Sequence, residues 1–309
     1  MSIHPSIQEV LNQVPLDLPR TLTPELIKEL RETRVPLPEE LRPKIYKKED
    51  QIIQGPNGDI PIRLYTPKEQ EENYIGVIAF HGGGWSLGNI ESHDGAFRQL
   101  ANVSGAKVIS VDYRLAPENP FPAGLEDCYA VLKWVCENAE SLQIDPEKIV
   151  VAGDSAGGNL SASLTQMARD RNGPKIWKQV LIYPATDALR SIEDSPYESV
   201  RENADAPILS ASVTKSFWDH YISTEDDANN PYCSPIRANS FENLPPALII
   251  TAQYDPIRDE GEAYGKKLME NGVPTIIRRV EGAIHGFITM PIPFAYEILE
   301  EIGKFIREK

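Results

Sequence analysis

The chain of 309 residues contains only three cysteines, and their placement does not suggest a covalent framework. Cys128, Cys136 and Cys233 are odd in number and irregularly spaced, so neither a set of disulfides nor a cysteine-based metal site is expected. Cys128 and Cys136 fall in one expected helix, where a free thiol packs as a small apolar group. This usage is typical of a reducing compartment, and we therefore expect a cytoplasmic protein.

Long apolar runs and an excess of positive charge are missing as well. No stretch of about 18 apolar residues is present, so no segment is expected to cross a bilayer. Residues 1–14 lack a basic start followed by an apolar stretch, so no signal peptide is expected. With 31 Lys and Arg against 46 Asp and Glu, the formal net charge is −15. Such a charge argues against nucleic acid or an anionic membrane surface as the partner.

The remaining composition is that of an ordinary globular protein, 41% hydrophobic and 25% charged. From about residue 50 onward, apolar runs of strand length alternate with helical stretches. This alternation predicts an α/β fold, with a mostly parallel central sheet flanked by helices. Asn57 and Gly58 indicate a hairpin that adds an antiparallel edge. The expected strands cover residues 50–54, 60–65, 75–80, 107–111, 149–152, 179–183, 247–251 and 275–280, and the expected helices cover 93–104, 124–139, 159–171 and 261–271.

Two segments fall outside this alternation, and we expect them to form a helical cap. The first contains a short helix with Thr23 as its N-cap and Pro24 at its first position. The second is a connection of about sixty residues that includes an apolar, aromatic helix candidate at 212–222, and so long a connection is usually a functional insertion. We expect one catalytic domain, divided into an N-terminal arm (1–50), a core in two parts (51–187 and 246–309) and a cap insertion (188–245).

The most informative stretch is the pentapeptide G-D-S-A-G at residues 153–157. It lies between an apolar run and a helical run, and this order predicts a sharp strand-to-helix turn that exposes the Ser155 hydroxyl. Small residues are needed on both sides of Ser155 because the backbone folds tightly there. A serine hydroxyl becomes a nucleophile only with a base, a group that orients the base, and donors for the oxyanion.

The base is expected to be a histidine, and the chain offers five: His4, His81, His93, His220 and His285. His93 lies near an expected helix start, and His220 lies in the expected cap helix. His285 follows the last expected strand, which is where a hydrolase with this serine motif carries its base. We therefore predict that His285 is the base, and that His81 holds its own loop by hydrogen bonds.

The orienting carboxylate should lie between the serine and the histidine in the chain. Asp255 stands where an expected strand gives way to a loop, and we favour it, while Asp187 stays as the rival because it follows the preceding strand. Asp259 and Glu260 are close by, but they are expected to start a helix, where negative charge suits the helix dipole. Asp154 is expected to point away from the serine and to brace the neighbouring loop.

Residues 81–84, H-G-G-G, follow an expected strand and predict the oxyanion donors. Backbone N–H groups suit this role because they are rigid, and glycines let the backbone approach the substrate. We expect the donors to be the N–H groups of Gly83, Gly84 and Ala156. Candidates for an apolar substrate pocket come from this loop, the cap and the loop of the base, although core packing explains the cap aromatics at least as well: Trp85, Leu209, Phe217, Trp218 and Phe287.

Five motifs are spread over most of the chain: H-G-G-G-W at 81–85, D-Y-R-L-A-P-E at 112–118, G-D-S-A-G-G-N at 153–159, D-P-I-R-D-E at 255–260 and H-G-F at 285–287. Together they resemble the hormone-sensitive-lipase-like esterases of the α/β-hydrolase fold, in particular the bacterial and archaeal carboxylesterases. The resemblance implies Ser155, Asp255 and His285 as the catalytic triad, a helical cap, and substrates with short to medium acyl chains. Asn119 and Gln253 depart from it, since relatives often carry histidine and glutamate there.

These parts predict a carboxylesterase that hydrolyses small-molecule esters through an acyl-enzyme. No cofactor or metal is expected, because the chain has no H-E-x-x-H or comparable ligand cluster. A small-molecule receptor, like the plant gibberellin receptors that resemble this family but have lost the base, is an alternative. An amide or a long-chain triglyceride as substrate is another. An open sheet leaves an edge strand that a second copy can pair with, so the sequence allows a homodimer without deciding for it.

Overall fold

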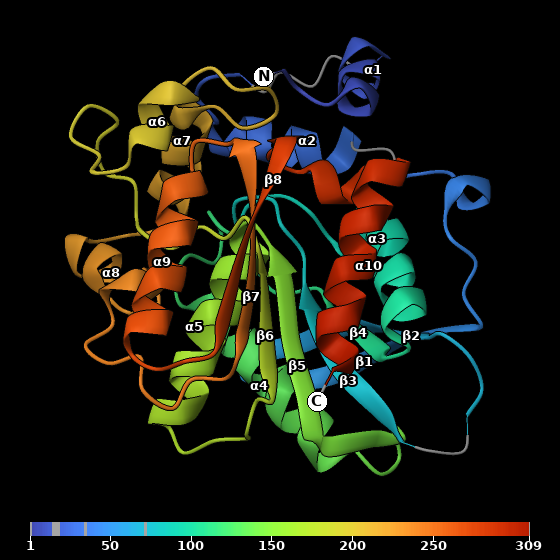
Figure 1. Ribbon diagram of the computed structural model, residues 1–309. Helices are drawn as coiled ribbons and strands as arrows, with labels where there is room; N and C mark the ends of the chain where they lie inside the picture. The colour runs from blue at the N-terminus through green and yellow to red at the C-terminus, as the bar shows by residue number, and fades with distance from the viewer. Residues whose placement is uncertain (1, 14–18, 34–35, 71–72, 309) are drawn as a thin grey trace.

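An eight-stranded sheet forms the centre of the structure, a computed structural model that describes residues 2–13, 19–33, 36–70 and 73–308 (Figure 1). The strand order is β1-β2-β4-β3-β5-β6-β7-β8. β2 pairs antiparallel with both β1 and β4, and every other pair is parallel. The strands are β1 (Lys47–Gly55), β2 (Gly58–Thr66), β3 (Tyr74–Phe80), β4 (Lys107–Val111), β5 (Ile144–Asp154), β6 (Lys178–Ile182), β7 (Ala247–Tyr254) and β8 (Thr275–Ile284).

Helices cover both faces of this sheet. α3 (Ile90–Ser104) and α10 (Pro293–Arg307) pack together on one face, and α4 (Ala123–Glu137), α5 (Ala156–Asp170) and α9 (Arg258–Glu270) lie on the other. Neighbouring residues of β3 divide between the faces, since Val77 belongs to the apolar cluster under α3 and α10 and Ile78 to the cluster under α4 and α5. This alternation follows from the period of two in a strand. The predicted α/β fold is confirmed.

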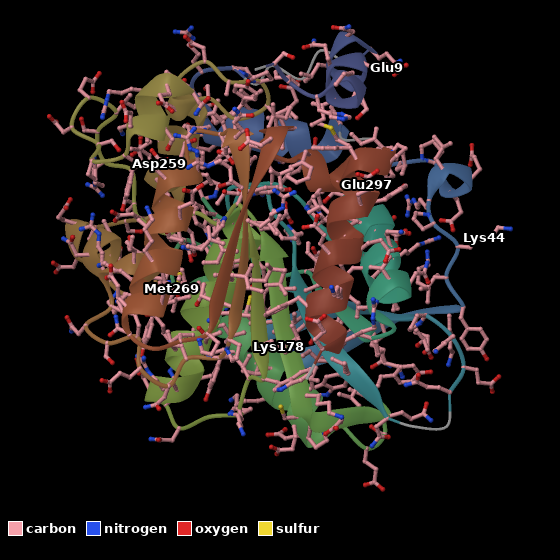
Figure 2. All side chains as sticks on the ribbon, viewed as in Figure 1. Glu9, Lys44, Lys178, Asp259, Met269 and Glu297 are labelled. Carbon is pink, nitrogen blue, oxygen red and sulfur yellow. The ribbon has the colours of Figure 1, made fainter. Side chains whose placement is uncertain are left out.

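Side chains on the outer faces of the helices point away from the sheet (Figure 2). Met269 on α9 and Glu297 on α10 are exposed examples. β5 begins five residues earlier than the expected strand at 149–152, because residues 145–148 are largely exposed and polar and so concealed the strand start. Among the helices that the structure describes, none is long and apolar enough to cross a membrane.

Helices from the two segments of the predicted cap lie beyond the carboxyl ends of β7 and β8 (Figure 1). They are α1 (Pro5–Gln13) and α2 (Pro24–Thr33) from the N-terminal region, and α6 (Glu198–Glu202) and α7 (Ala211–Tyr221) from the connection before β7. Leu22 and Ile27 from the N-terminal region share an apolar cluster with Val213 and Phe217, and the Leu22 N–H donates to Ser216 Oγ at 3.0 Å. The division into arm, core and insertion stays a prediction. The N-terminal region also contains a 3₁₀ turn at Glu39–Leu41. The connection between β6 and β7 also contains α8 (Glu225–Asn229) and a 3₁₀ turn at Pro235–Arg237. A third 3₁₀ turn, Phe287–Thr289, follows β8.

Candidate active site

Ser155 lies at the turn between β5 and α5, in a backbone conformation that L-residues rarely adopt. Its φ is 56° and its ψ is −119°. The turn is tight because a Cβ on Gly157 would collide with the carbonyl oxygen of Phe80, and a Cβ on Gly153 would collide with Gly157 itself. The Ser155 N–H donates to the Ile182 carbonyl at 2.8 Å, which holds the strained residue against β6. The hydroxyl is thereby presented at the carboxyl edge of the sheet.

Hydrogen bonds connect Ser155 to His285 and His285 to Asp255. His285 Nε2 lies 2.8 Å from Ser155 Oγ, and His285 Nδ1 lies 2.7 Å from Asp255 Oδ2. Asp255 is fully buried, and its other oxygen accepts from the Ile257 N–H at 3.0 Å. A carboxylate that accepts from Nδ1 fixes the histidine tautomer, so the unprotonated Nε2 faces the serine hydroxyl. The chain thus places a proton acceptor beside the hydroxyl.

The other carboxylates considered from the sequence lie elsewhere. Asp187 accepts from Arg237 Nε at 2.6 Å and from the Tyr197 hydroxyl at 2.9 Å. Asp259 stands in the first turn of α9, as expected. Glu260 is buried, and burial together with the charge of Asp187 raises its pKa well above the usual value. The structure therefore brings Asp255, and not Asp187, to His285.

The glycine loop presents backbone N–H groups beside Ser155. Gly83 and Gly84 have φ values of 122° and 57°, which favour glycine. Over the ranges that the structure describes, no acceptor within the protein is found for the N–H groups of Gly83 and Gly84. The Ala156 N–H lies in the first turn of α5, where helical N–H groups have no partner within the helix. These three groups are free to bind an oxyanion.

Three side chains hold this loop in place. His81 Nδ1 donates to the Gly82 carbonyl at 2.9 Å, and the His81 ring stacks on Tyr113 with centroids 4.3 Å apart. The Tyr113 hydroxyl donates to the His81 carbonyl at 2.6 Å. Asp154 Oδ1 accepts from the Gly82 N–H at 3.0 Å. These contacts agree with the bracing roles expected of His81 and Asp154.

A cavity of about 330 Å³ opens onto Ser155 and His285. Gly82, Gly83 and Gly84 form part of its wall. Its apolar lining comes from α1, the glycine loop, the segment that leads into α7, α7 itself and the loop after β8: Val10, Leu87, Ile208, Leu209, Phe217 and Met290. The two predicted pocket residues Leu209 and Phe217 are thus at the cavity.

The structure corrects the other three pocket candidates, which pack in the interior and do not line this cavity. Trp85 stacks on Tyr221 with centroids 4.2 Å apart and also contacts Trp218. Trp218 is fully buried, because it follows Phe217 on α7 and one helical step turns its side chain about 100° away from the cavity. Phe287 is fully buried against Tyr183.

Sequence reasoning missed several residues of the site. Val10, Ile208 and Met290 carry no motif, and only the packing of distant segments brings them to the cavity. Ile208 has a φ of 69°, an unusual conformation for a β-branched side chain. Tyr183, whose φ is 35°, lies with its ring centroid 4.6 Å from that of His285. Its position directly after β6 was the only signal available.

The three cysteines are not among the residues that line the cavity. All three cysteines are free thiols, and burial raises the pKa of Cys136 to about 11. Among the described residues, no group of three or more His, Cys, Asp and Glu side chains could hold a metal ion. The groups that meet at the cavity include the Ser155 hydroxyl, the His285 imidazole and backbone N–H groups of the glycine loop.

Comparisons with known proteins show which family this chain resembles. A family model described as an alpha/beta hydrolase fold matches residues 77–289. The carboxylesterase NlhH of Mycobacterium tuberculosis is 42% identical over 265 residues, which cover 84% of this chain and 82% of that protein. The arylesterase of Saccharolobus solfataricus is 42% identical over 243 residues, which cover 78% and 77% of the two chains.

A solved structure extends the likeness to the whole chain. It is that of a hyperthermophilic esterase from the archaeon Pyrobaculum calidifontis, with a TM-score of 0.90, 41% identity, and coverage of 99% of this chain and 98% of that one. The residues matched by the family model include all five sequence motifs. The chain therefore belongs to the α/β-hydrolase fold family, and within it to the hormone-sensitive-lipase-like esterases.

Proposed function

We propose that this protein is a carboxylesterase that hydrolyses short- to medium-chain carboxylic esters, with Ser155 as nucleophile, His285 as base and Asp255 as the orienting acid. One observation carries the proposal. Ser155 Oγ lies 2.8 Å from His285 Nε2, at the floor of a largely apolar cavity bordered by unpartnered backbone N–H groups. The similarity to a carboxylesterase and an arylesterase, each 42% identical, supports the same reaction class.

Acylation begins when Ser155 Oγ attacks the ester carbonyl carbon and His285 Nε2 takes the hydroxyl proton. The carbonyl oxygen becomes an oxyanion, and the N–H groups of Gly83, Gly84 and Ala156 stabilise it. Asp255 holds the imidazole tautomer and stabilises the imidazolium that forms. Collapse of the tetrahedral intermediate breaks the bond to the alcohol oxygen, which leaves with the proton from His285 Nε2.

Deacylation repeats these steps with water. His285 Nε2 takes a proton from a water molecule, whose oxygen attacks the carbonyl carbon of the acyl-enzyme. The same N–H groups bind the second oxyanion. When that intermediate collapses, Ser155 Oγ leaves with the proton from His285, and the carboxylic acid is released.

The cavity supports a preference for short to medium acyl chains. Its volume of about 330 Å³ is near the lower end of the range for small-molecule sites, roughly 300–1,000 Å³. Apolar side chains dominate its lining and suit an ester, which offers few hydrogen-bonding groups. A long-chain triglyceride would need more room than this.

A receptor without turnover and a true lipase remain the competing functions, and one set of measurements separates them. Chromogenic esters from acetate to palmitate should be hydrolysed with the highest kcat/KM among the short and medium chains. Ser155→Ala should lower kcat on the order of 10⁶-fold, as such changes do in serine proteases. Tight ester binding without turnover would favour a receptor, and a preference for emulsified long chains would favour a lipase.

We also propose that the protein acts on small molecules in the cytoplasm, which suits its free, buried or half-buried cysteines. β1 and β8 are the two edges of the sheet, and pairing of two copies through one of them is the form that a homodimer would take. Light scattering across a dilution series measures that state directly.

A further inference from the structure

His93 lies beneath the glycine loop, although no sequence motif assigned it a role. It belongs to the first turn of α3 and is almost fully buried. Its Nε2 lies 3.0 Å from Asp154 Oδ1, and the Gly82 nitrogen lies 3.0 Å from that same oxygen and 3.2 Å from His93 Nε2. One carboxylate oxygen thus meets both the histidine and the loop that carries the oxyanion donors.

The hydrogen bonds at Nδ1 indicate which protons His93 carries. Nδ1 lies 2.8 Å from Ser92 Oγ. That hydroxyl accepts from the Asn89 N–H at 3.0 Å and lies 2.8 Å from the Asn89 carbonyl, which can only accept. Because the hydroxyl has one proton and gives it to the carbonyl, the proton between His93 and Ser92 belongs to Nδ1.

The other ring nitrogen faces the carboxylate. Nε2 lies 3.0 Å from Asp154 Oδ1 and accepts from the Gly82 N–H at 3.2 Å, so the ring, the carboxylate and the loop meet at one point. Burial alone would raise the pKa of Asp154, but interactions with His93, His285 and the Gly82 N–H outweigh burial and lower it.

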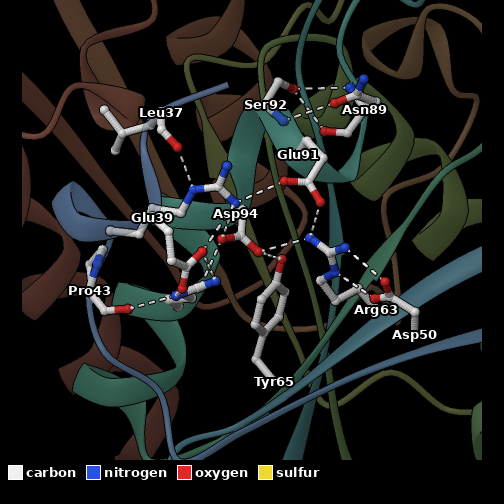
Figure 3. Close-up of polar contacts among 12 residues, drawn as sticks. Leu37, Glu39, Pro43, Asp50, Arg63, Tyr65, Asn89, Glu91, Ser92 and Asp94 are labelled. Carbon is white, nitrogen blue, oxygen red and sulfur yellow. Dashed lines mark hydrogen bonds and ion pairs between the residues drawn. The ribbon is translucent and has the colours of Figure 1, made fainter. Parts of the chain in front are cut away.

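A buried ionic cluster holds the turn that carries His93 (Figure 3). Asp94 is fully buried and lies 3.0 Å from Arg63 Nη1, 2.7 Å from Arg42 Nη1 and 2.7 Å from Arg98 Nε. The Tyr65 hydroxyl donates to Asp94 at 2.8 Å. These partners come from the N-terminal region, β2 and α3 itself, so the first turn of α3 is fixed independently of the glycine loop.

We propose that His93 is a positioning residue of the oxyanion hole, which holds the Asp154 carboxylate and the Gly82 N–H in place. Gly83 and Gly84 follow directly, so the direction of their N–H groups depends on where Gly82 is held. The inference rests on the proposed esterase function. His93 and Asp154 both border the catalytic cavity, and His93 acts here through Asp154 and the Gly82 N–H.

The titratable groups that face His93 are few. Asp154 comes from β5, and His81 comes from the glycine loop with its ring centroid 5.7 Å away. Asp94, on the same helical turn, faces the arginines. A substitution of His93 therefore acts on Asp154 and the Gly82 N–H first.

Kinetics of two substitutions test the proposal. His93→Leu removes both ring contacts, and His93→Gln keeps a polar amide beside Asp154 and the Gly82 N–H. We expect kcat to fall roughly 10- to 100-fold in the leucine variant and less in the glutamine variant, with KM within about threefold, because oxyanion donors act in the transition state. The inhibition constant of a trifluoromethyl ketone, which forms an oxyanion on Ser155, should rise by the same factor as kcat/KM falls.

His220→Gln is the control, because His220 is a half-buried histidine away from the cavity lining whose ring contacts the Leu22 carbonyl at 2.5 Å. Its kcat should stay within about twofold of the parent. Phosphonate titration of active sites corrects every rate for the folded fraction. A His93 variant that loses thermal stability but keeps kcat per titrated site would show that His93 is only structural, and the inference would be overturned.

Nuclear magnetic resonance of the unaltered protein tests the hydrogen bonds of His93 without any reliance on a variant that folds. In ¹⁵N-histidine-labelled protein, Nδ1 of His93 should carry the proton shared with Ser92 Oγ, and Nε2 should accept from the Gly82 N–H. A ring protonated at Nε2 alone would contradict this arrangement. If the parent protein hydrolyses no ester, the proposed function is wrong. If the parent is active and the His93 variants keep its kinetics, only the inference about His93 is wrong.

Discussion

Gly84 and Phe217 are in direct contact across the catalytic cavity. A Cβ placed on Gly84 would overlap the ring of Phe217, which comes from α7 more than a hundred residues later in the chain. The loop that carries two proposed oxyanion donors is therefore in contact with the side chain that forms part of the cavity roof. Glycine is required at this position by the neighbouring ring, in addition to its φ of 57°.

Gly84→Ala should lower kcat/KM by about 10²-fold, the size of effect seen when one oxyanion donor is lost. The added methyl group must push either the loop or the Phe217 ring out of place. The double variant Gly84→Ala with Phe217→Ala removes the overlap and should recover part of the loss. A single alanine variant with parental kinetics would contradict the contact.

Phe217→Ala should shift the acyl-chain preference towards longer esters, because it removes a ring from the cavity lining. The measurement is kcat/KM over a series from acetate to palmitate. Trp218→Ala is the matched control from the same helix. It should lower the free energy of unfolding by about 3–5 kcal/mol, as large-to-small core changes do, without shifting the preference.

Asp255→Asn should lower kcat by about 10⁴-fold, as the corresponding change does in serine proteases, because the amide favours the wrong histidine tautomer. Asp187→Asn is the control, since Asp187 contacts Arg237 and Tyr197 instead of His285. Its kcat should be close to that of the parent. The reverse order of effects would move the orienting role to Asp187.

Asp94→Asn should lower the free energy of unfolding at pH 7 by about 3–5 kcal/mol, because it leaves buried arginine charges without their partner. Burial by itself raises the pKa of Asp94, but hydrogen bonds from Arg42 and Tyr65 outweigh this and lower it. A lowered folded-state pKa means that the stabilisation is present above about pH 4 and is lost as pH falls through the folded value. Urea unfolding should therefore show the variant and parent converging at acid pH.

Glu260→Gln should make stability less dependent on pH. The pKa of Glu260 is raised by burial and by the charge of Asp187, so the folded state keeps its proton to higher pH than the unfolded state does. In the parent, the stabilisation that Glu260 contributes is complete below its unfolded-state pKa of about 4.3. It declines as pH rises towards the folded-state pKa. Glutamine keeps an acceptor for the Thr186 N–H, which lies 2.7 Å from Glu260 Oε1. The free energy of unfolding of the variant should rise relative to that of the parent as pH increases above about 4.3, and a difference that does not change with pH would refute the shift.

Local patterns were enough to predict the scaffold. The alternation of apolar runs and helices placed the inner strands, because a strand buried on both faces is recognisable from its own residues. The turn at Asn57 and Gly58 placed β1 and β2, although β1 is largely exposed. β5 was predicted too short, since residues 145–148 continue the strand while facing solvent. The turn around Ser155 was predictable because glycines at 153 and 157 are needed wherever two backbones approach so closely.

The lining of the cavity could not be predicted in this way. Phe217 and Trp218 are neighbours of similar character, and only the orientation of α7 decides that Phe217 faces Ser155 while Trp218 is buried. His93 looked like an ordinary residue at a helix start. Its relation to Asp154 exists because α3 and β5, about sixty residues apart, meet beneath the glycine loop.

By itself, the sequence determined the α/β class, the position of the strained serine, and the chain order of serine, aspartate and histidine, because each depends on a few adjacent residues. Only the tertiary structure decided that Asp255 and not Asp187 reaches His285, and which apolar side chains surround the hydroxyl. Those outcomes depend on distances between segments far apart in the chain, which are set by packing of the whole molecule.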